Sequence, residues 1–165
     1  MIRVAINGYG RIGRSVLRAL YESGARSSVQ VVAINEPADS KTIAHLTRYD
    51  STHGRFPGVV DGSDHSLTVN GDSIQILHNE QLDRLPWADL DIDLVLECSG
   101  SFSERQTAEL HLASGAKRVL FSQPAESTVD ATIVYGINQH LLSGDQTIVS
   151  AASCSTNCVV PVIKV

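Results

Sequence analysis

The stretch Gly8-Tyr9-Gly10-Arg11-Ile12-Gly13 constrains the fold more than any other part of the chain. It follows a short apolar run at residues 2–6 and precedes a segment with apolar residues at helical spacing. A second apolar run at residues 29–34 completes a strand, helix and strand unit. G-x-G-x-x-G at such a turn is typical of a loop that places a dinucleotide pyrophosphate at a helix N-terminus. The alternative is a glycine-rich turn without a ligand.

The three glycines have different tasks in such a loop. Gly8 permits the tight turn, Gly10 lets the backbone approach the pyrophosphate, and Gly13 lets the helix pack on the strand. Glu36 ends the second strand, where an acidic residue binds the hydroxyls of the adenosine ribose. Its carboxylate would repel a 2′-phosphate, so we expect NAD rather than NADP as the cofactor.

Further strand and helix patterns predict an α/β fold: a Rossmann-type, doubly wound and mainly parallel sheet with an antiparallel hairpin insertion. The hairpin is expected about Asn70-Gly71, a strong type I′ turn signal. Because ligands bind at the carboxyl ends of strands in such sheets, we expect Ser99 to line the nicotinamide side of the cleft. The strands are expected at residues 2–6, 29–34, 67–69, 72–76, 92–98, 119–121, 131–135 and 147–150. Three helices are expected, each with an apolar face that packs on the sheet. The residues on these faces are Ile12, Val16, Ala19 and Leu20 in the first helix, Ile43, Ala44 and Leu46 in the second, and Ala108, Leu112 and Ala113 in the third.

Composition excludes several other classes of protein. The net charge is −5 and the basic residues are scattered, which disfavours a general nucleic-acid binder. No apolar run approaches the length of a membrane span, and the start of the chain has no leader pattern, so we expect a cytoplasmic protein. The six histidines show no metal-ligand spacing, so we expect no metal. The three cysteines, an odd number without the spacing of a disulfide framework, indicate a reducing compartment. Cys98 lies in an apolar strand, so we expect it to be a buried core residue.

A second motif, Ser153-Cys154-Ser155-Thr156-Asn157-Cys158, lies near the end of the sequence. It reads as a strand end, a tight turn and a helix start. A helix N-terminus favours a thiolate over a thiol, so we interpret Cys154 as a nucleophile. Pro161 leaves two alternatives open, a helix that begins near Cys154 or one that begins only near Pro161. In a non-catalytic module, Cys154 and Cys158 would instead be packing or redox-sensitive thiols.

The loop at residues 49–58 is dense in polar side chains. His53 and Arg55 are candidates for contact with a ligand or a neighbouring subunit. A solvated or loop-bracing role is the favoured interpretation.

Taken together, residues 5–14, residues 49–56, Ser99-Gly100 and the motif at 153–158 resemble the phosphorylating glyceraldehyde-3-phosphate dehydrogenase family. Residues 18–24, 85–87, 121–124 and 130–138 look more like its D-erythrose-4-phosphate dehydrogenase subgroup. The resemblance implies oxidation of D-erythrose 4-phosphate to 4-phosphoerythronate by NAD, through a thiohemiacetal and a thioester on Cys154. The alternatives are glyceraldehyde-3-phosphate dehydrogenase itself and a non-catalytic NAD-binding module.

The resemblance also implies roles for single residues. It places Asn7 at the cofactor, the backbone of Arg11 and Ile12 on the pyrophosphate, and Ser122 near the cofactor. It places Ser153 and Ser155 beside the substrate. Helix capping is an equally favoured role for these two serines.

The chain departs from the family pattern at three points. Ser155 replaces the usual Thr, Glu80 stands where relatives commonly carry Arg near the adenine, and the family's histidine base lies in a second half beyond Lys164-Val165. We therefore expect an NAD-binding domain at residues 1–150 and the start of a catalytic domain at 151–165. We expect NAD binding with little turnover, and a monomer or weak dimer where the full-length family member is a homotetramer.

Overall fold

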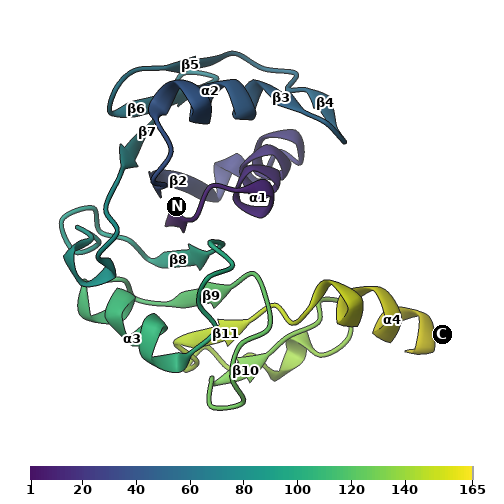
Figure 1. The fold of residues 1–165 in the computed structure, drawn as a ribbon. Helices are drawn as coiled ribbons and strands as arrows, with labels where there is room; N and C mark the ends of the chain where they lie inside the picture. Colours follow the sequence, from purple (N-terminus) through teal and green to yellow (C-terminus); the bar gives the residue numbers. More distant parts are fainter. Residues whose placement is uncertain (165) are drawn as a thin grey trace.

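The computed structural model describes residues 1–164 as a large sheet with helices on both faces (Figure 1). The helices are α1 (Arg11–Glu22), α2 (Ser40–Arg48), α3 (Arg105–Ala113) and α4 (Cys154–Lys164), with short 3-10 turns at η1 (Ala25–Ser27), η2 (Leu82–Arg84) and η3 (Gln139–Leu141). The strands are β1 (Ile2–Asn7), β2 (Val29–Asn35), β3 (Tyr49–Asp50), β4 (Gly54–Arg55), β5 (Val60–Gly62), β6 (Ser66–Val69), β7 (Asp72–Leu77), β8 (Leu94–Glu97), β9 (Val119–Phe121), β10 (Ala131–Thr132) and β11 (Ile148–Ser150).

The nine-stranded sheet has the order β10-β11-β9-β8-β1-β2-β7-β6-β5. All pairs from β10 to β7 are parallel, and β6 and β5 add an antiparallel edge. The chain moves outward from β1 through β2 to β7, then returns to place β8 on the other side of β1. This order from β7 to β11 is that of dinucleotide-binding sheets, and the carboxyl ends of β1 and β8 form its switch point. The predicted fold class is confirmed.

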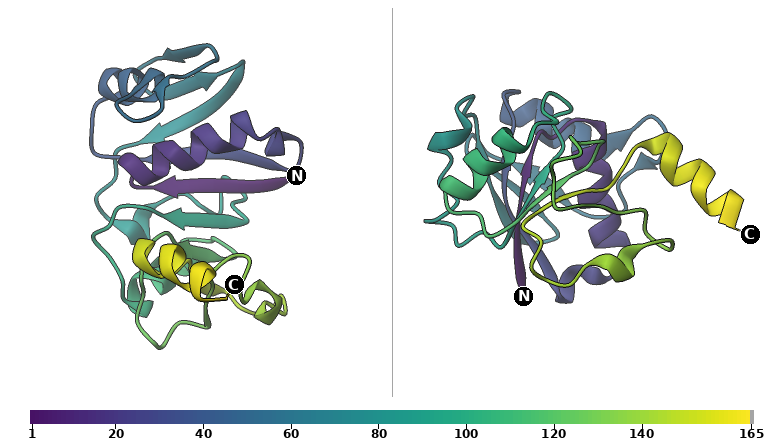
Figure 2. Two further views of the ribbon diagram at one scale, coloured as in Figure 1. Left: turned by 90° about the vertical axis from the view of Figure 1, so that its right-hand side faces the viewer. Right: turned by 90° about the horizontal axis from the view of Figure 1, so that it is seen from below.

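Both faces of the central strands are buried, as a parallel sheet requires. Ile6 and Ile34 pack with Leu17 of α1 on one face. Ala5 and Ala33, their neighbours in sequence, face the second core on the other side, which contains Trp87 and Ala108 of α3. Neighbouring side chains of a strand point to opposite faces, so these two strands support both cores. In Figures 1 and 2, α1 and α3 accordingly lie on opposite sides of the sheet.

The inward faces of three helices differ from the expected ones. In α1, Ile12 is 49% exposed and Val16 and Ala19 are also exposed, whereas Gly13 and Leu17 are buried. The cause is the close approach at Gly13, which turns that side of α1 to the sheet. Leu46 and Ala113 are exposed for a similar reason, because Ile43 with Ala44, and Ala108 with His111, occupy the buried sides of α2 and α3.

The expected strands are largely present, with three shorter than predicted. β8 spans Leu94–Glu97 rather than residues 92–98, β10 ends at Thr132 rather than at Tyr135, and β11 begins at Ile148 rather than at Thr147. Beyond β10 the backbone turns, because Val134 N–H donates to the side chain of Asn138. The hairpin between β6 and β7 is confirmed, with φ of 50° at Asn70 and 90° at Gly71, the two positive values that a type I′ turn needs.

The last helix, α4, projects from the body of the molecule (Figures 1 and 2). It starts at Cys154 and continues through Pro161, so the first of the two alternatives for its start is confirmed. None of its described residues is buried, and Val162 and Ile163 are about three-quarters exposed. The predicted start of a catalytic domain at residues 151–165 includes residue 165, which lies outside the described residues. Among residues 1–164, no helix is both long and apolar enough to cross a bilayer.

Candidate functional site

A cleft of about 370 Å³ opens at the carboxyl ends of β1, β2 and β8. It lies at the switch point of the sheet, where such folds bind their ligands. Its lining residues include two carboxylates and no lysine or arginine. The lining residues are Asn7, Gly8, Gly10, Asn35, Glu36, Pro37, Asn79, Glu80, Leu82, Ser99, Ser101 and Phe102.

The glycine loop shows which of its glycines the protein itself requires. A Cβ on Gly8 would lie 2.3 Å from Ser99 Cα, and a Cβ on Gly13 would lie 2.4 Å from the carbonyl oxygen of Gly8. A Cβ on Gly10 would meet nothing within 4 Å, and its φ of −72° suits any residue. Neither packing nor backbone conformation therefore requires glycine at position 10. The space that a Cβ would fill there belongs to the cleft, as expected for close approach of a pyrophosphate.

The N-terminus of α1 carries no competing anion. Gly10 is its N-cap residue, no side chain caps the helix, and its first turn contains no acidic residue. The first N–H groups of a helix have no partner within it and attract anions. Arg11 and Ile12, the first helical residues, are exposed and do not line the cleft with their side chains. The geometry suits an anion held by backbone N–H groups.

Glu36 lies directly after β2 and lines the cleft, as its position in the sequence predicts. Its Oε2 accepts from the backbone N–H of Tyr9 at 2.7 Å, and its Oε1 accepts from Ala38 N–H at 3.3 Å. These bonds fix the carboxylate beside the glycine loop and leave further lone pairs for a ligand.

The structure brings together five residues that the sequence places at the cofactor, namely Asn7, Gly8, Gly10, Glu36 and Ser99. Gly13 lies beneath the loop and serves packing. Ser122 is not part of the lining. It follows β9, and its hydroxyl donates to Gln123 Oε1 at 2.7 Å.

A buried polar network that the sequence patterns did not predict lies under the cleft. Asn7 Nδ2 donates to Glu97 Oε2 at 2.6 Å, and Asn35 Nδ2 donates to Asn7 Oδ1 at 2.7 Å. Asn35 also exchanges hydrogen bonds with the backbone of Asn79. On the far side, His111 Nε2 lies 3.2 Å from Glu97 Oε2. A signal was present in the sequence: β1, β2 and β8 are mainly apolar, and each ends in a polar residue, Asn7, Asn35 or Glu97.

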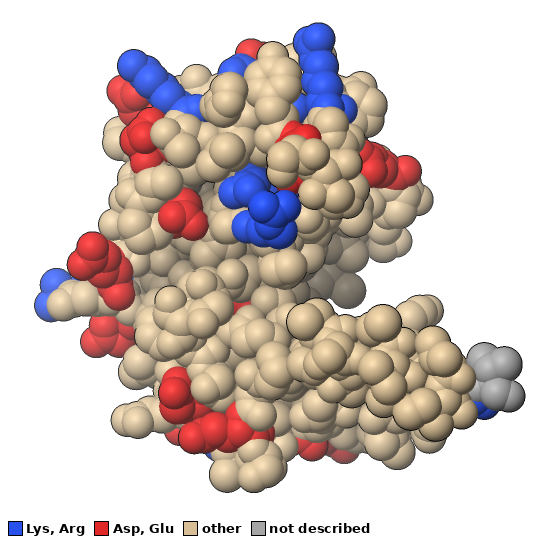
Figure 3. Space-filling view, turned by 45° about the vertical axis from the view of Figure 1, so that its right-hand side comes forward, with Lys and Arg blue, Asp and Glu red and all other residues tan. Residues whose placement is uncertain are grey.

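Cys154 is the first residue of α4 and is exposed. Ser153 caps this helix, because its Oγ accepts from Thr156 N–H at 2.9 Å. Its hydroxyl also lies 2.9 Å from the hydroxyl of Ser155. The capping interpretation of Ser153 is confirmed. Figure 3 shows α4 as an arm beside a hollow in the surface, and Lys164 in its last turn is the one charged side chain among its described residues.

The turn before Cys154 is strained. Ala152 is buried and has a φ of 61°, a left-handed conformation that is costly for a residue with a Cβ. Ala152 N–H donates to Ser150 Oγ, and Asn157 Nδ2 donates to the carbonyl oxygens of Ala151 and Ser153. These bonds hold the turn that starts α4 directly after β11.

The other cysteines differ in environment. Cys98 is buried, as predicted, and burial raises the pKa of its thiol to about 11 against a smaller lowering by a hydrogen bond with Ser122. Cys158 is exposed on α4, and all three are free thiols. Cys154 and Cys158 are thus the two exposed thiols.

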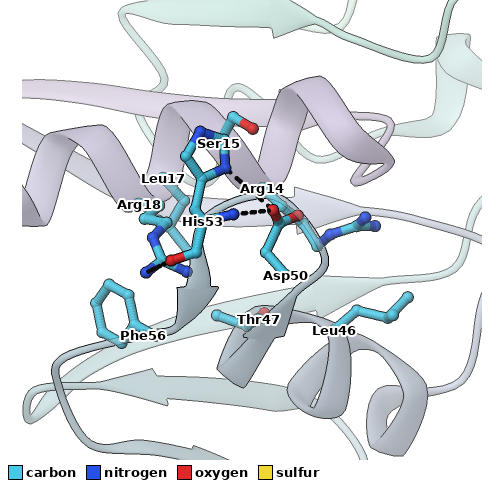
Figure 4. A pocket seen from close by; sticks show the side chains of 9 residues that line it. All are labelled: Arg14, Ser15, Leu17, Arg18, Leu46, Thr47, Asp50, His53 and Phe56. Atoms are coloured by element: carbon cyan, nitrogen blue, oxygen red, sulfur yellow. Dashed lines mark hydrogen bonds and ion pairs between the residues drawn. The ribbon is translucent and has the colours of Figure 1, made fainter.

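His53 braces its own loop, the role that the sequence analysis favoured. Its Nδ1 lies 3.0 Å from Asp50 Oδ1 (Figure 4), and its backbone N–H donates to the same oxygen. Arg18 of α1 donates to the carbonyl oxygens of His53, Gly54 and Arg55. The pocket that Arg18, Asp50 and His53 help to line has a volume of only about 10 Å³.

Residues 1–164 contain no group of three or more His, Cys, Asp or Glu side chains placed to hold a metal ion. The expectation that no metal binds stays a prediction.

The parallel sheet with its switch point at β1 and β8, and the glycine loop that opens α1, define a dinucleotide-binding protein of the Rossmann type. Residues 2–105, more than half of the chain, match the family model described as glyceraldehyde 3-phosphate dehydrogenase, NAD binding domain. The chain belongs to this family, and its cofactor is NAD. The family indicates an NAD-dependent dehydrogenase.

Proposed function

We propose that the chain supplies the cofactor cleft and the cysteine nucleophile of an NAD-dependent sugar-phosphate aldehyde dehydrogenase. The observation that carries this proposal is the position of Cys154, which is exposed at the first residue of α4, just after β11. The strands β11, β9, β8 and β1 are parallel, so Cys154 follows the same edge of the sheet as the cleft.

In the proposed reaction the Cys154 thiolate attacks the aldehyde carbon, and the carbonyl oxygen takes up a proton to give a thiohemiacetal. NAD, when bound, supplies the hydride acceptor for oxidation to a thioester. Attack of water on the thioester releases the acid and returns the thiol. In this proposal Cys154 acts from the first residue of α4, and the hydroxyls of Ser153 and Ser155 lie beside the substrate.

We propose the contacts to NAD from the positions of the residues in and around the cleft. The backbone of Gly10, Arg11 and Ile12 binds the pyrophosphate, and Glu36 accepts from the hydroxyls of the adenosine ribose. Asn7, Gly8 and Ser99 form the floor toward the nicotinamide, with Ser122 beyond them, directly after the neighbouring strand β9. Gly13 supports the loop from below.

For the substrate we propose D-erythrose 4-phosphate, oxidised to 4-phosphoerythronate, on the subgroup motifs of the sequence. The second candidate is glyceraldehyde 3-phosphate as the substrate, with phosphate as the acceptor of the acyl group from the thioester. The third candidate is a non-catalytic NAD-binding module. In this proposal residues 1–150 form the cofactor domain and residues 151–165 begin a catalytic domain. We propose that this chain is a monomer or weak dimer in the cytoplasm.

We propose that this chain turns over slowly. Within residues 1–164 no hydrogen bond joins the sulfur of Cys154 to a histidine, and in this proposal no general base acts on Cys154. Loss of a general base costs on the order of 10² to 10⁴ in rate.

Calorimetric titration with NAD and an NADH absorbance assay with each sugar phosphate test the proposal. We expect saturable binding of one NAD per chain and slow NADH formation, faster with D-erythrose 4-phosphate, that disappears in Cys154→Ser. Cys158→Ser is the matched control and should retain the rate. Absence of NAD binding would contradict the cofactor cleft. Equal rates in the two cysteine variants would contradict the nucleophile and favour the non-catalytic module.

A further inference from the structure

The strongest unexplained feature of the molecule is the buried carboxylate of Glu97 at the end of β8. Glu97 is fully buried and accepts four hydrogen bonds. Its Oε1 accepts from Ser99 N–H at 2.8 Å and from Ser99 Oγ at 2.5 Å. Its Oε2 accepts from Asn7 Nδ2 at 2.6 Å and from His111 Nε2 at 3.2 Å. An ionised carboxylate offers about four acceptor positions, and all of them are used.

Trp87 fixes the direction of the hydrogen bond between His111 and Glu97. Its indole N–H can only donate, and it donates to His111 Nδ1 at 3.0 Å. We therefore assign the ring hydrogen of His111 to Nε2, where it points at Glu97. Burial acts to raise the pKa of Glu97, but hydrogen bonds from His111, Ser99 and Asn7 outweigh it and hold the pKa below its usual range. The carboxylate is ionised and has no lysine or arginine partner among the described residues.

A buried charge of this kind is a poor device for stability alone. Removing a carboxylate from water costs several kcal/mol, and apolar side chains fill such space at less cost. What the carboxylate does is bind donors from two elements that line the cleft. Asn7 ends β1, while Ser99 begins the segment at residues 99–102 that forms one wall.

The bonds to Ser99 fix that wall. The hydroxyl of Ser99 accepts from Ser101 N–H at 3.2 Å, and its own hydrogen is directed to Glu97. The backbone of Ser99 lies against Gly8, with no room for a Cβ between them. A shift of Ser99 would therefore move the wall of the cleft and the glycine loop together.

We propose that Glu97 is a positioning residue for NAD, holding the wall at residues 99–102 against the glycine loop through Ser99 and Asn7 without touching the cofactor. The inference rests on NAD occupying this cleft, which the titration of the unaltered chain tests separately.

The test is a calorimetric NAD titration of the chain and its variants, with the thermal midpoint of each measured in parallel. Glu97→Gln puts an amide N–H₂ where two donors now bind, and Ser99→Ala removes one of those donors. We expect each variant to weaken NAD binding about tenfold, the effect of about 1.4 kcal/mol. The double variant should bind no more weakly than Glu97→Gln, because both changes break the same contact.

Trp87→Phe is the matched control. It removes a buried hydrogen bond of the same network on the side away from the cleft, and it should lower the thermal midpoint while the NAD dissociation constant stays within about twofold of the parent value. An equal loss of affinity in Trp87→Phe would show that the network acts only through stability and would overturn the proposal. Multiplying losses in the double variant would overturn the route through Ser99.

Ser99→Thr keeps the proposal testable if Glu97→Gln does not fold. Threonine restores the hydroxyl at an exposed position, so NAD affinity should return to the parent value in Ser99→Thr after its loss in Ser99→Ala. Unchanged affinity in Ser99→Ala would overturn the proposal.

Discussion

The backbones of Gly8 and Ser99 touch, so that a Cβ on Gly8 would lie 2.3 Å from both Ser99 N and Ser99 Cα. This contact joins the turn after β1 to the end of β8 at the switch point of the sheet. The φ of Gly8 is 87°, so a side chain there is also strained.

Alanine should therefore affect stability at Gly8 and NAD affinity at Gly10. Gly8→Ala should lower the free energy of unfolding by about 2–4 kcal/mol through strain and overpacking. Gly10→Ala should change it by less than about 1 kcal/mol, yet weaken NAD binding at least tenfold, about 1.4 kcal/mol, because its Cβ enters the cleft. Urea unfolding and calorimetry measure the two quantities. Unchanged NAD affinity in Gly10→Ala would show that the pyrophosphate does not approach this position.

Glu36 should decide between NAD and NADP. Glu36→Gln removes the charge that would face a 2′-phosphate, so binding of NADP relative to NAD should rise about tenfold. Competition titrations with the two cofactors measure this ratio. Glu22→Gln, on the exposed end of α1, is the control and should leave the ratio unchanged. If the ratio stays constant in Glu36→Gln, the carboxylate lies away from the ribose.

The three cysteines should react with iodoacetamide at different rates. Cys154 should react first because it is exposed at a helix N-terminus, and Cys158 should follow because it is exposed within the helix. Cys98 should stay unmodified at pH 8, since it is buried and its thiol has a pKa of about 11. Mass spectrometry of timed digests gives the order. Equal modification of all three would rule out an activated Cys154.

Glycine at position 152 should stabilise the chain. The left-handed conformation costs alanine roughly 1–2 kcal/mol, while glycine adopts it freely but loses more backbone entropy on folding. Ala152→Gly should raise the free energy of unfolding by about 0.5–1 kcal/mol. Ala151→Gly, one residue earlier and without positive φ, should lower it. Urea unfolding compares the pair, and a loss of stability in Ala152→Gly would contradict the strain.

Asp130 should contribute stability that is lost in acid. Its carboxylate accepts from the backbone N–H groups of Ile148 and Thr147 and pairs with Arg105. A bond from Ile148 N–H, then the bond to Arg105, holds the pKa of Asp130 below its usual range. The contribution is therefore full above the ordinary pKa of a free aspartate and disappears as the pH falls through the lower folded pKa.

Asp130→Asn should accordingly destabilise the chain at pH 7 by about 1 kcal/mol, and the difference from the parent should shrink below about pH 3. Asp145→Asn, on an exposed turn, should show little effect at either pH. Unfolding curves across this pH range measure both variants. A difference that grows in acid would contradict the assignment.

Local patterns predict the elements that depend on neighbours in sequence. The glycine loop, the Asn70-Gly71 hairpin and the start of α4 follow from backbone preferences that a few residues specify. The inward face of α1 does not, because it depends on contact between Gly13 and the carbonyl of Gly8, and a hydrophobic count alone favours Ile12 and Val16. The network of Asn7, Asn35, Glu97 and His111 joins residues up to 104 positions apart, and it forms only when three strand ends meet.

The Trp87–His111 contact has an optical consequence. Trp87 is the only tryptophan of the sequence, it is fully buried, and its N–H is engaged by a neutral imidazole rather than by water. Its fluorescence therefore reports on one place alone, the core between α3 and the sheet. The emission maximum should lie at short wavelength in the folded chain and move to longer wavelength when that core opens, so the molecule carries its own probe of unfolding on the face opposite α1.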